Sequence, residues 1–182
     1  MKNNHSNTIA IKVRGLAQGE NQVSLQFDTS LLDDPAFSGT GTVTGILKRD
    51  GDRLDLHAEV SAEGEFDCTR CADTFRRRII APLSLHIVPP QFEPNEGDPD
   101  VHVYDPLSDS EVDILQDVRD ALILAIPMVH LCRPDCKGLC PTCGKNLNRE
   151  QHDCHEETEA EGAWSALNRV RERLRAEENK ET

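Results

Sequence analysis

The first half of the chain is dominated by runs in which apolar and polar residues alternate with a period of two. These runs are residues 8–13, 22–27, 40–47, 54–66 and 78–88. Successive side chains of a strand point to opposite faces, so each run has one apolar face to bury. An Asp-Gly turn signal lies between two of the runs, in residues 48–53. The pattern predicts an antiparallel β-sheet or small barrel in the N-terminal half, with the last strand broken by Pro82.

A segment rich in proline and acid, residues 89–109, follows the strands and predicts a surface loop with one short strand at residues 101–104. A helix is expected next. Its apolar residues recur at helical spacing: Leu115, Val118, Leu122, Ala125 and Ile126. Two capping-box patterns, at residues 110–113 and 113–116, precede it, and Pro127 ends it. We expect this helix to pack on the sheet as a core helix.

The tail predicts a second amphipathic helix. One apolar stripe is formed by Ala163, Trp164, Leu167, Val170 and Leu174. Docking against the body is the first interpretation, and a detachable partner-binding helix is the alternative. The expected architecture is therefore α+β. Residues 1–128 form a β-rich domain with a core helix, and residues 129–182 form a zinc-binding, Cys-rich segment with a C-terminal helix.

The formal net charge of −13 is concentrated, since ten acidic residues and one basic residue lie between residues 91 and 120. Such a surface repels a polyanion, which argues against a general RNA clamp and favours a basic protein partner such as a ribosomal protein. Solubility alone is the plainer interpretation. Local RNA contact stays open through two small basic groups: Arg70, Arg76, Arg77 and Arg78, and Arg133, Lys137, Lys145 and Arg149.

Seven cysteines cannot all pair within one chain, so a disulfide framework is disfavoured. The N-terminal residues lack an apolar signal segment, and the longest apolar run, residues 121–128, is too short for a membrane span. We therefore expect a cytoplasmic protein in a reducing compartment, where clustered cysteines indicate a metal.

The most specific chemical signal is a cluster of ligand-type residues between residues 131 and 154. Its members are Cys132, Cys136, Cys140, Cys143, His152 and Cys154. Zinc takes four thiolate or imidazole ligands in a tetrahedron. A Cys-x-x-Cys turn presents two of them, and Gly144 after the second cysteine lets the chain turn back. The cluster predicts structural zinc.

An earlier Cys-x-x-Cys pair, Cys68 and Cys71, is flanked by strand-like sequence, so we expect it at a hairpin tip as a less certain ligand pair. Eight ligands suffice for two sites. One partition joins Cys140 and Cys143 to His152 and Cys154, and Cys68 and Cys71 to Cys132 and Cys136. A single site of Cys136, Cys140, Cys143 and Cys154 is equally compatible.

No catalytic pattern accompanies these ligands: the sequence contains no Gly-x-Ser-x-Gly, Walker loop or His-Glu-x-x-His. A catalytic zinc keeps an open position, whereas a dense thiolate set closes the coordination. A thioredoxin-type pair would precede a helix, and Cys68 and Cys71 do not. The expectation is a protein that is not an enzyme.

Four blocks resemble the YceD family, also called the large ribosomal RNA subunit accumulation protein family. They are FDCTRC at residues 66–71, EVDILQDVRDALILAIPM at 111–128, LCRPDCKGLCPTCGKNLN at 131–148 and AWSALNRVRERL at 163–174. The family pattern usually closes with Cys-x-Cys, and here the first of these positions is His152.

The resemblance implies a role in accumulation or processing of the large-subunit (23S) ribosomal RNA. Together with the lack of a catalytic pattern, it predicts a non-enzymatic accessory factor in large-subunit biogenesis. The charge distribution predicts a basic ribosomal protein or an assembly intermediate as its partner. The alternatives are a zinc-ribbon nucleic-acid-binding regulator, which needs a contiguous basic face, and a thiol redox protein, which needs a reactive low-pKa cysteine.

Overall fold

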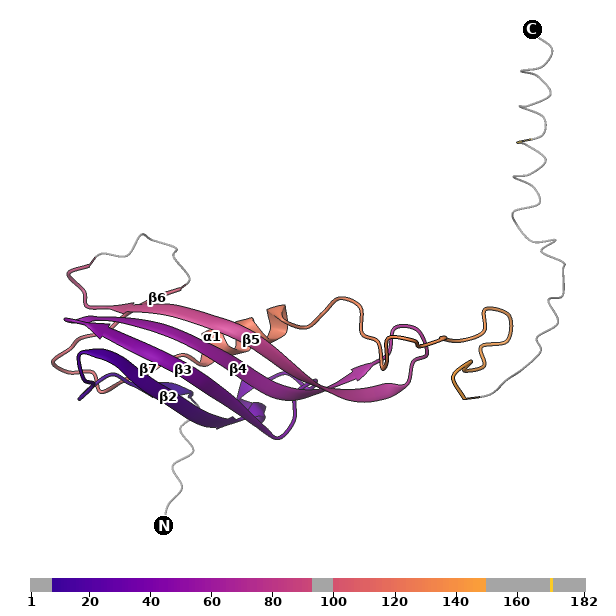
Figure 1. Ribbon diagram of the computed structural model, residues 1–182, viewed down its shortest axis with the longest axis horizontal. Coiled ribbons are helices and arrows are strands. Elements are labelled where there is room, and N and C mark those ends of the chain that lie inside the picture. Colours follow the sequence, from indigo (N-terminus) through magenta and orange to yellow (C-terminus); the bar gives the residue numbers. More distant parts are fainter. Residues whose placement is uncertain (1–7, 93–99, 150–170, 172–182) are drawn as a thin grey trace, which may run out of the picture. The chain divides into compact units, whose positions relative to one another are not determined.

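The computed structural model describes residues 8–92, 100–149 and 171. The chain divides into two compact units, Met1–Cys136 and Lys137–Thr182. The strands and helices that the described residues form lie in the first unit (Figure 1). They are β1 (Ala10–Lys12), β2 (Gly19–Asp28), the short 3-10 helix η1 (Thr29–Leu32), β3 (Thr40–Asp50), β4 (Arg53–Asp67), β5 (Thr74–Val88), β6 (Val101–Val103), β7 (Glu111–Asp113) and α1 (Leu115–Leu124).

The main sheet has five strands in the order β2-β3-β4-β5-β6. The first four are antiparallel neighbours, as the alternating runs predicted, and β6 adds to β5 in parallel. A second, two-stranded sheet pairs β1 with β7. The expected antiparallel sheet is confirmed.

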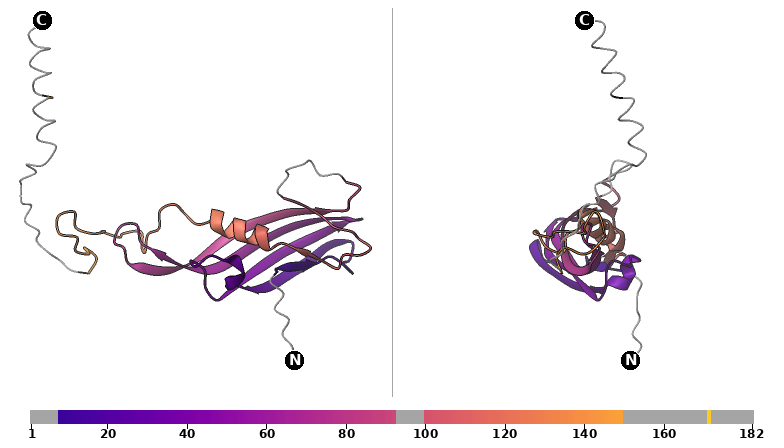
Figure 2. Two further views of the ribbon diagram at one scale, coloured as in Figure 1. Left: turned by 180° about the vertical axis from the view of Figure 1, so that it is seen from behind. Right: turned by 90° about the vertical axis from the view of Figure 1, so that its right-hand side faces the viewer.

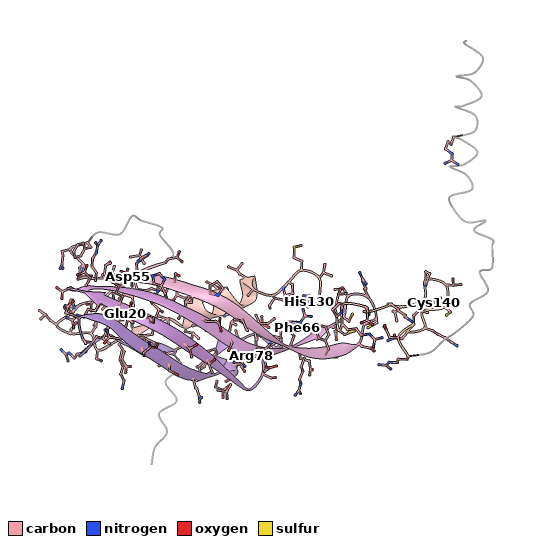
Figure 3. The ribbon with its side chains drawn as sticks, in the orientation of Figure 1. Glu20, Asp55, Phe66, Arg78, His130 and Cys140 are labelled. Carbon is pink, nitrogen blue, oxygen red and sulfur yellow. The ribbon has the colours of Figure 1, made fainter. Side chains whose placement is uncertain are left out.

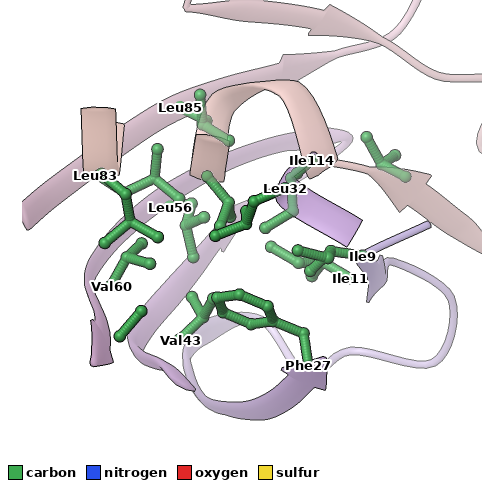
Figure 4. Close-up of a cluster of buried hydrophobic side chains, with 14 of the residues drawn as sticks. Ile9, Ile11, Phe27, Leu32, Val43, Leu56, Val60, Leu83, Leu85 and Ile114 are labelled. Atoms are coloured by element: carbon green, nitrogen blue, oxygen red, sulfur yellow. The ribbon is translucent and has the colours of Figure 1, made fainter. Parts of the chain in front are cut away.

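One face of the main sheet is the floor of the core, and α1 lies against it (Figure 2). Alternate residues of β5 are buried, among them Leu83, Leu85 and Ile87. They share the core with Leu56 of β4 and Val43 of β3, both 0% exposed (Figure 4). Burial of each such side chain contributes about 1.5–3 kcal/mol. The core of this unit therefore depends on apolar packing.

The predicted core helix is present as α1, and Val118 and Leu122 on its inner face are 0% exposed. Its start differs from the capping-box expectation. Glu111–Asp113 pairs with β1 as strand β7 instead of opening the helix. The Asp113 carboxylate then accepts a hydrogen bond from the backbone N–H of Leu115 (2.9 Å). Tertiary pairing with β1 overrides the first local helix signal, while the second signal marks the helix start.

The expectation that Pro82 breaks the last strand is wrong, because β5 continues through it from Thr74 to Val88. The backbone N–H of His86 donates to the Asp100 carbonyl on the β6 side (2.8 Å). Backbone direction alternates along a strand, so Pro82 faces the same edge as His86. β6 pairs with β5 only at His86–Val88, so the missing N–H of Pro82 costs no described ladder bond.

The β4–β5 hairpin is longer than the rest of the sheet (Figure 1). β3 pairs with β4 only as far as Ser61, whereas β4 and β5 remain paired to Asp67 and Thr74. A two-stranded ribbon is marginally stable by itself in water. Its outer end must therefore be held by other contacts.

In the described part of the chain, no helix has both the length and the apolar character needed to span a membrane. The predicted C-terminal amphipathic helix lies outside the described residues.

Candidate metal centre at the hairpin tip

The loop between β4 and β5 is a Cys-x-x-Cys turn, as expected from its flanking strands. The backbone N–H of Cys68 donates to the Asp73 carbonyl (2.9 Å), and the N–H of Ala72 donates to the Cys68 carbonyl (2.9 Å). Ala72 has a left-handed backbone with φ 56°. This reversal directly after Cys71 folds the chain back and leaves both sulfurs on one side of the turn.

Two further cysteines come from the segment that follows α1, and hydrogen bonds attach that segment to the turn. The backbone N–H of Thr69 donates to the His130 carbonyl (2.8 Å). The Arg70 guanidinium donates to the Cys136 carbonyl (3.0 Å), and the Arg77 guanidinium donates to the Leu131 carbonyl (3.0 Å). These bonds place Cys132 and Cys136 opposite the hairpin tip.

Aromatic rings pack immediately below the turn. The rings of Phe66 and His130 meet edge to face with centroids 5.0 Å apart (Figure 3). Phe75 and Leu131 pack against the cysteines. The tip thus has its own small core, which is formed mainly by cysteine side chains.

The four cysteines form one group, the tip cluster: Cys68, Cys71, Cys132 and Cys136. Their sulfur atoms all lie within 4.8 Å of one another. Two of the distances, Cys68 Sγ to Cys136 Sγ and Cys71 Sγ to Cys132 Sγ, are 3.7 Å. A tetrahedral thiolate site with metal–sulfur distances of about 2.3 Å has sulfur–sulfur edges of about 3.8 Å. No disulfide bond joins these cysteines. The group has the donor set and spacing to hold a metal ion.

The pKa values of the tip thiols diverge. Burial raises the pKa of Cys68, but hydrogen bonds from backbone N–H groups, first that of Cys132, and from the Cys71 thiol bring it down to about 6. The backbone N–H of Asp73 lowers the pKa of Cys71, whereas burial and the neighbouring thiols raise it to about 12. Burial also raises the pKa of Cys132.

One thiolate is therefore stabilised at neutral pH by backbone N–H groups, while Cys71 and Cys132 retain protons that a metal ion would displace. Cys68 itself is only 2% exposed. This burial restricts access of reagents to the thiolate, unlike the exposed low-pKa cysteine of a redox protein.

A second Cys-x-x-Cys turn, Cys140 to Cys143, lies in the second unit and repeats the backbone of the first. The N–H of Cys140 donates to the Lys145 carbonyl (2.8 Å), and the N–H of Gly144 donates to the Cys140 carbonyl (2.9 Å). Gly144 has φ 73° at the position equivalent to Ala72. Leu139 and Asn146 pair across the base of this turn.

The structure thus brings Cys132 and Cys136 together with Cys68 and Cys71. This grouping matches one set of the two-set partition. The remaining predicted ligands, His152 and Cys154, lie outside the described residues. Cys68 and Cys71, which the sequence predicted as a less certain ligand pair, supply half of the described cluster. The strand-like sequence on both sides of this pair predicted its place at a hairpin tip. The spacing of residues in the sequence did not predict the hydrogen bonds that Arg70 and Arg77 donate to the segment after α1.

Comparisons with known proteins identify a family. The family model described as large ribosomal RNA subunit accumulation protein YceD matches residues 56–171. The chain is 33% identical over 129 residues to the chloroplastic large ribosomal RNA subunit accumulation protein YCED homolog 1 of Zea mays, across 57% of this chain and 44% of the maize protein. It is 31% identical over 125 residues to an uncharacterized protein of Mycobacterium tuberculosis, across 63% of this chain and 59% of that protein.

The chain spans about half the length of the curated relatives it matches. No solved structure matches it. The family match covers more than half of the chain and includes both Cys-x-x-Cys turns. The chain belongs to the YceD family of large ribosomal RNA subunit accumulation proteins.

Proposed function

We propose that this protein is a non-enzymatic accessory factor in biogenesis of the large ribosomal subunit, where it supports accumulation or processing of the large-subunit ribosomal RNA. The observation that carries the proposal is the YceD family match over residues 56–171. That stretch contains most of the β4–β5 hairpin, α1 and the tip cluster. The name of the maize relative points to the same process.

The proposed role of the tip cluster is structural zinc binding. Four buried or half-buried thiols with near-tetrahedral spacing offer complete coordination and no position for a substrate. The ion would tie the end of a two-stranded ribbon to the segment after α1, and its binding free energy would add to folding. A second ion would use Cys140 and Cys143 with His152 and Cys154, according to the sequence prediction.

The proposed partner is a basic ribosomal protein or an assembly intermediate in the cytoplasm. The net charge of −13 supports this choice, because a strongly acidic protein attracts basic proteins and repels the RNA backbone. Local contact with ribosomal RNA through the arginines of β5 fits the same role. Arg76 is already paired with Glu65 (3.3 Å), which lowers the charge that this group offers.

The test is sucrose-gradient sedimentation of the tagged protein from cell lysate, with and without RNase treatment. We expect the protein to travel with large-subunit particles or their precursors and to shift to the top after RNase. A tip variant, Cys136→Ser, should lose this association, whereas Glu59→Gln on the exposed strand face should keep it. Wild-type protein at the top of both gradients, with unchanged large-subunit RNA levels after gene deletion, would contradict the proposal.

A further inference from the structure

A groove of about 480 Å³ lies between α1 and the edge of β5, away from the tip cluster. Its lining is Pro82, Leu83, Ser84, Leu85, Asp100, Asp117, Asp120, Ala121 and Leu124. The helical residues follow the spacing i, i+3, i+4 and i+7 from Asp117 to Leu124, so they share one face of α1. We name this feature the acidic groove.

The lining of the acidic groove includes apolar side chains, one of which is highly exposed. Leu83 and Leu85 are buried lining residues, and Leu124, which also lines the groove, is 84% exposed. Met128, four residues further along the chain and beyond the end of α1, is 97% exposed. Large exposed apolar side chains beside a groove are typical of a protein interaction surface.

The rim carries three carboxylates and, among the described lining residues, no lysine or arginine. Asp120 accepts a hydrogen bond from the Gln116 amide (2.9 Å), which leaves its charge uncompensated. Asp117 is held in place by the His102 ring (3.0 Å). Asp120 therefore places a negative charge beside the apolar lining residues of the groove.

The adjoining edge of β5 offers little backbone pairing. No described strand pairs with it at residues 82–85, and Pro82 has no N–H to donate. The missing donor disfavours extension of the sheet at this edge, so an occupant held mainly by its side chains fits it better.

We propose that the acidic groove binds a basic amphipathic segment of a protein partner, with an apolar side chain on Leu83, Leu85 and Leu124 and lysine or arginine side chains against the carboxylates. This inference deepens the proposed function and rests on it for the ribosomal origin of the partner. RNA is the poorer occupant, because its phosphates would meet carboxylates and, among the described lining residues, no lysine or arginine.

The test uses the purified full chain and a short fluorescein-labelled helical peptide of leucine and lysine as the probe. Fluorescence anisotropy at about physiological ionic strength measures binding while long-range charge attraction is screened. Matched probes are the same peptide with leucine replaced by serine, the same peptide with lysine replaced by glutamate, and a short single-stranded RNA. We expect only the leucine and lysine peptide to bind well.

Two matched pairs of variants locate the binding. Asp120→Arg changes the groove, and Glu111→Arg makes the same charge change at an exposed residue outside the groove lining. Leu124→Glu changes the rim, and Leu107→Glu alters a side chain that is equally exposed at 84%. Each groove variant should weaken binding by about tenfold or more, and each control by at most about twofold.

The inference is overturned if both members of each pair weaken binding equally, if the serine peptide binds as tightly, if the RNA occupies the groove, or if no peptide binds. If the peptide fails to bind but the wild-type protein still travels with large-subunit particles, the binding role of the acidic groove is rejected and the proposed function stands. Groove-dependent peptide binding by a protein that never enters those particles keeps the groove and removes the proposed function.

Discussion

The two Cys-x-x-Cys turns have the same backbone but different surroundings. In each, the first cysteine donates to the carbonyl five residues ahead and the residue after the second cysteine has a left-handed φ. The first turn ends a long hairpin, and its cysteines are 2% and 3% exposed. In the second turn Cys140 is 7% exposed and Cys143 is exposed. A short sequence is enough to build the turn, whereas a site requires a second pair of ligands supplied by the fold.

The largest expected effect separates the two turns by their metal content. Cys136→Ser should abolish binding of the tip ion, because it removes one of four ligands and leaves buried thiols without a metal. Cys143→Ser should leave the tip ion in place. Native mass spectrometry gives the metal count, and hydrogen exchange of residues 68–75 reports opening of the tip. Loss of protection at the tip in both variants would show that the two turns share one ion.

Acidification should release the metal ion from the tip cluster gradually, over a wide pH range. The measurement uses the Cys143→Ser variant, so that metal bound at the second turn does not contribute. The pKa of Cys71 is raised to about 12 and that of Cys132 is also raised, so both are protonated at neutral pH without metal. Binding displaces at least these two protons, so zinc affinity should fall by about a hundredfold or more per pH unit as the pH decreases.

Below pH 6 the dependence should steepen, because Cys68, with a pKa of about 6, then also carries a proton that zinc must displace. Competition with a chromophoric chelator at several pH values measures the affinity. An affinity that stays constant between neutral pH and pH 6 would count against coordination by Cys71 and Cys132.

A smaller effect concerns the bond that attaches the first turn to the opposing segment. Arg70→Ala removes the donor to the Cys136 carbonyl. It should make the free energy of zinc binding at the tip cluster less favourable by about 1–2 kcal/mol. Thr142 occupies the equivalent position in the second turn and is exposed, so Thr142→Ala is the matched control and should leave the tip unchanged. Chelator competition at one pH compares them. Equal zinc affinity in both variants would show that the Arg70 hydrogen bond does not support zinc binding at the tip cluster.

The smallest effect tests the residue after each second cysteine by opposite substitutions. Ala72→Gly relieves a left-handed alanine and should stabilise the first turn by up to about 1 kcal/mol, whereas Gly144→Ala should destabilise the second by about 1 kcal/mol. A Cβ at position 144 meets no atom within 4 Å, so the effect is conformational rather than steric. Zinc affinity of each turn is the readout, and changes of the same sign in both variants would break the comparison.

The sequence by itself determined the local elements. The alternating runs predicted the strands, the helical spacing of Leu115, Val118 and Leu122 predicted α1, and the Cys-x-x-Cys spacing predicted both turns. These features depend on periodicity and on short-range hydrogen bonds, which neighbouring residues specify.

Only the tertiary structure decided which cysteines meet. Cys68 and Cys136 are separated by 68 positions in the sequence, and spacing alone left Cys136 equally compatible with the second turn. The long hairpin places the first turn beyond the sheet, and the bonds from Thr69, Arg70 and Arg77 bring the later segment to it. The continuity of β5 through Pro82 and the acidic groove have the same origin. Each depends on which edges and faces remain uncovered once distant segments have packed, and no local pattern contains that information.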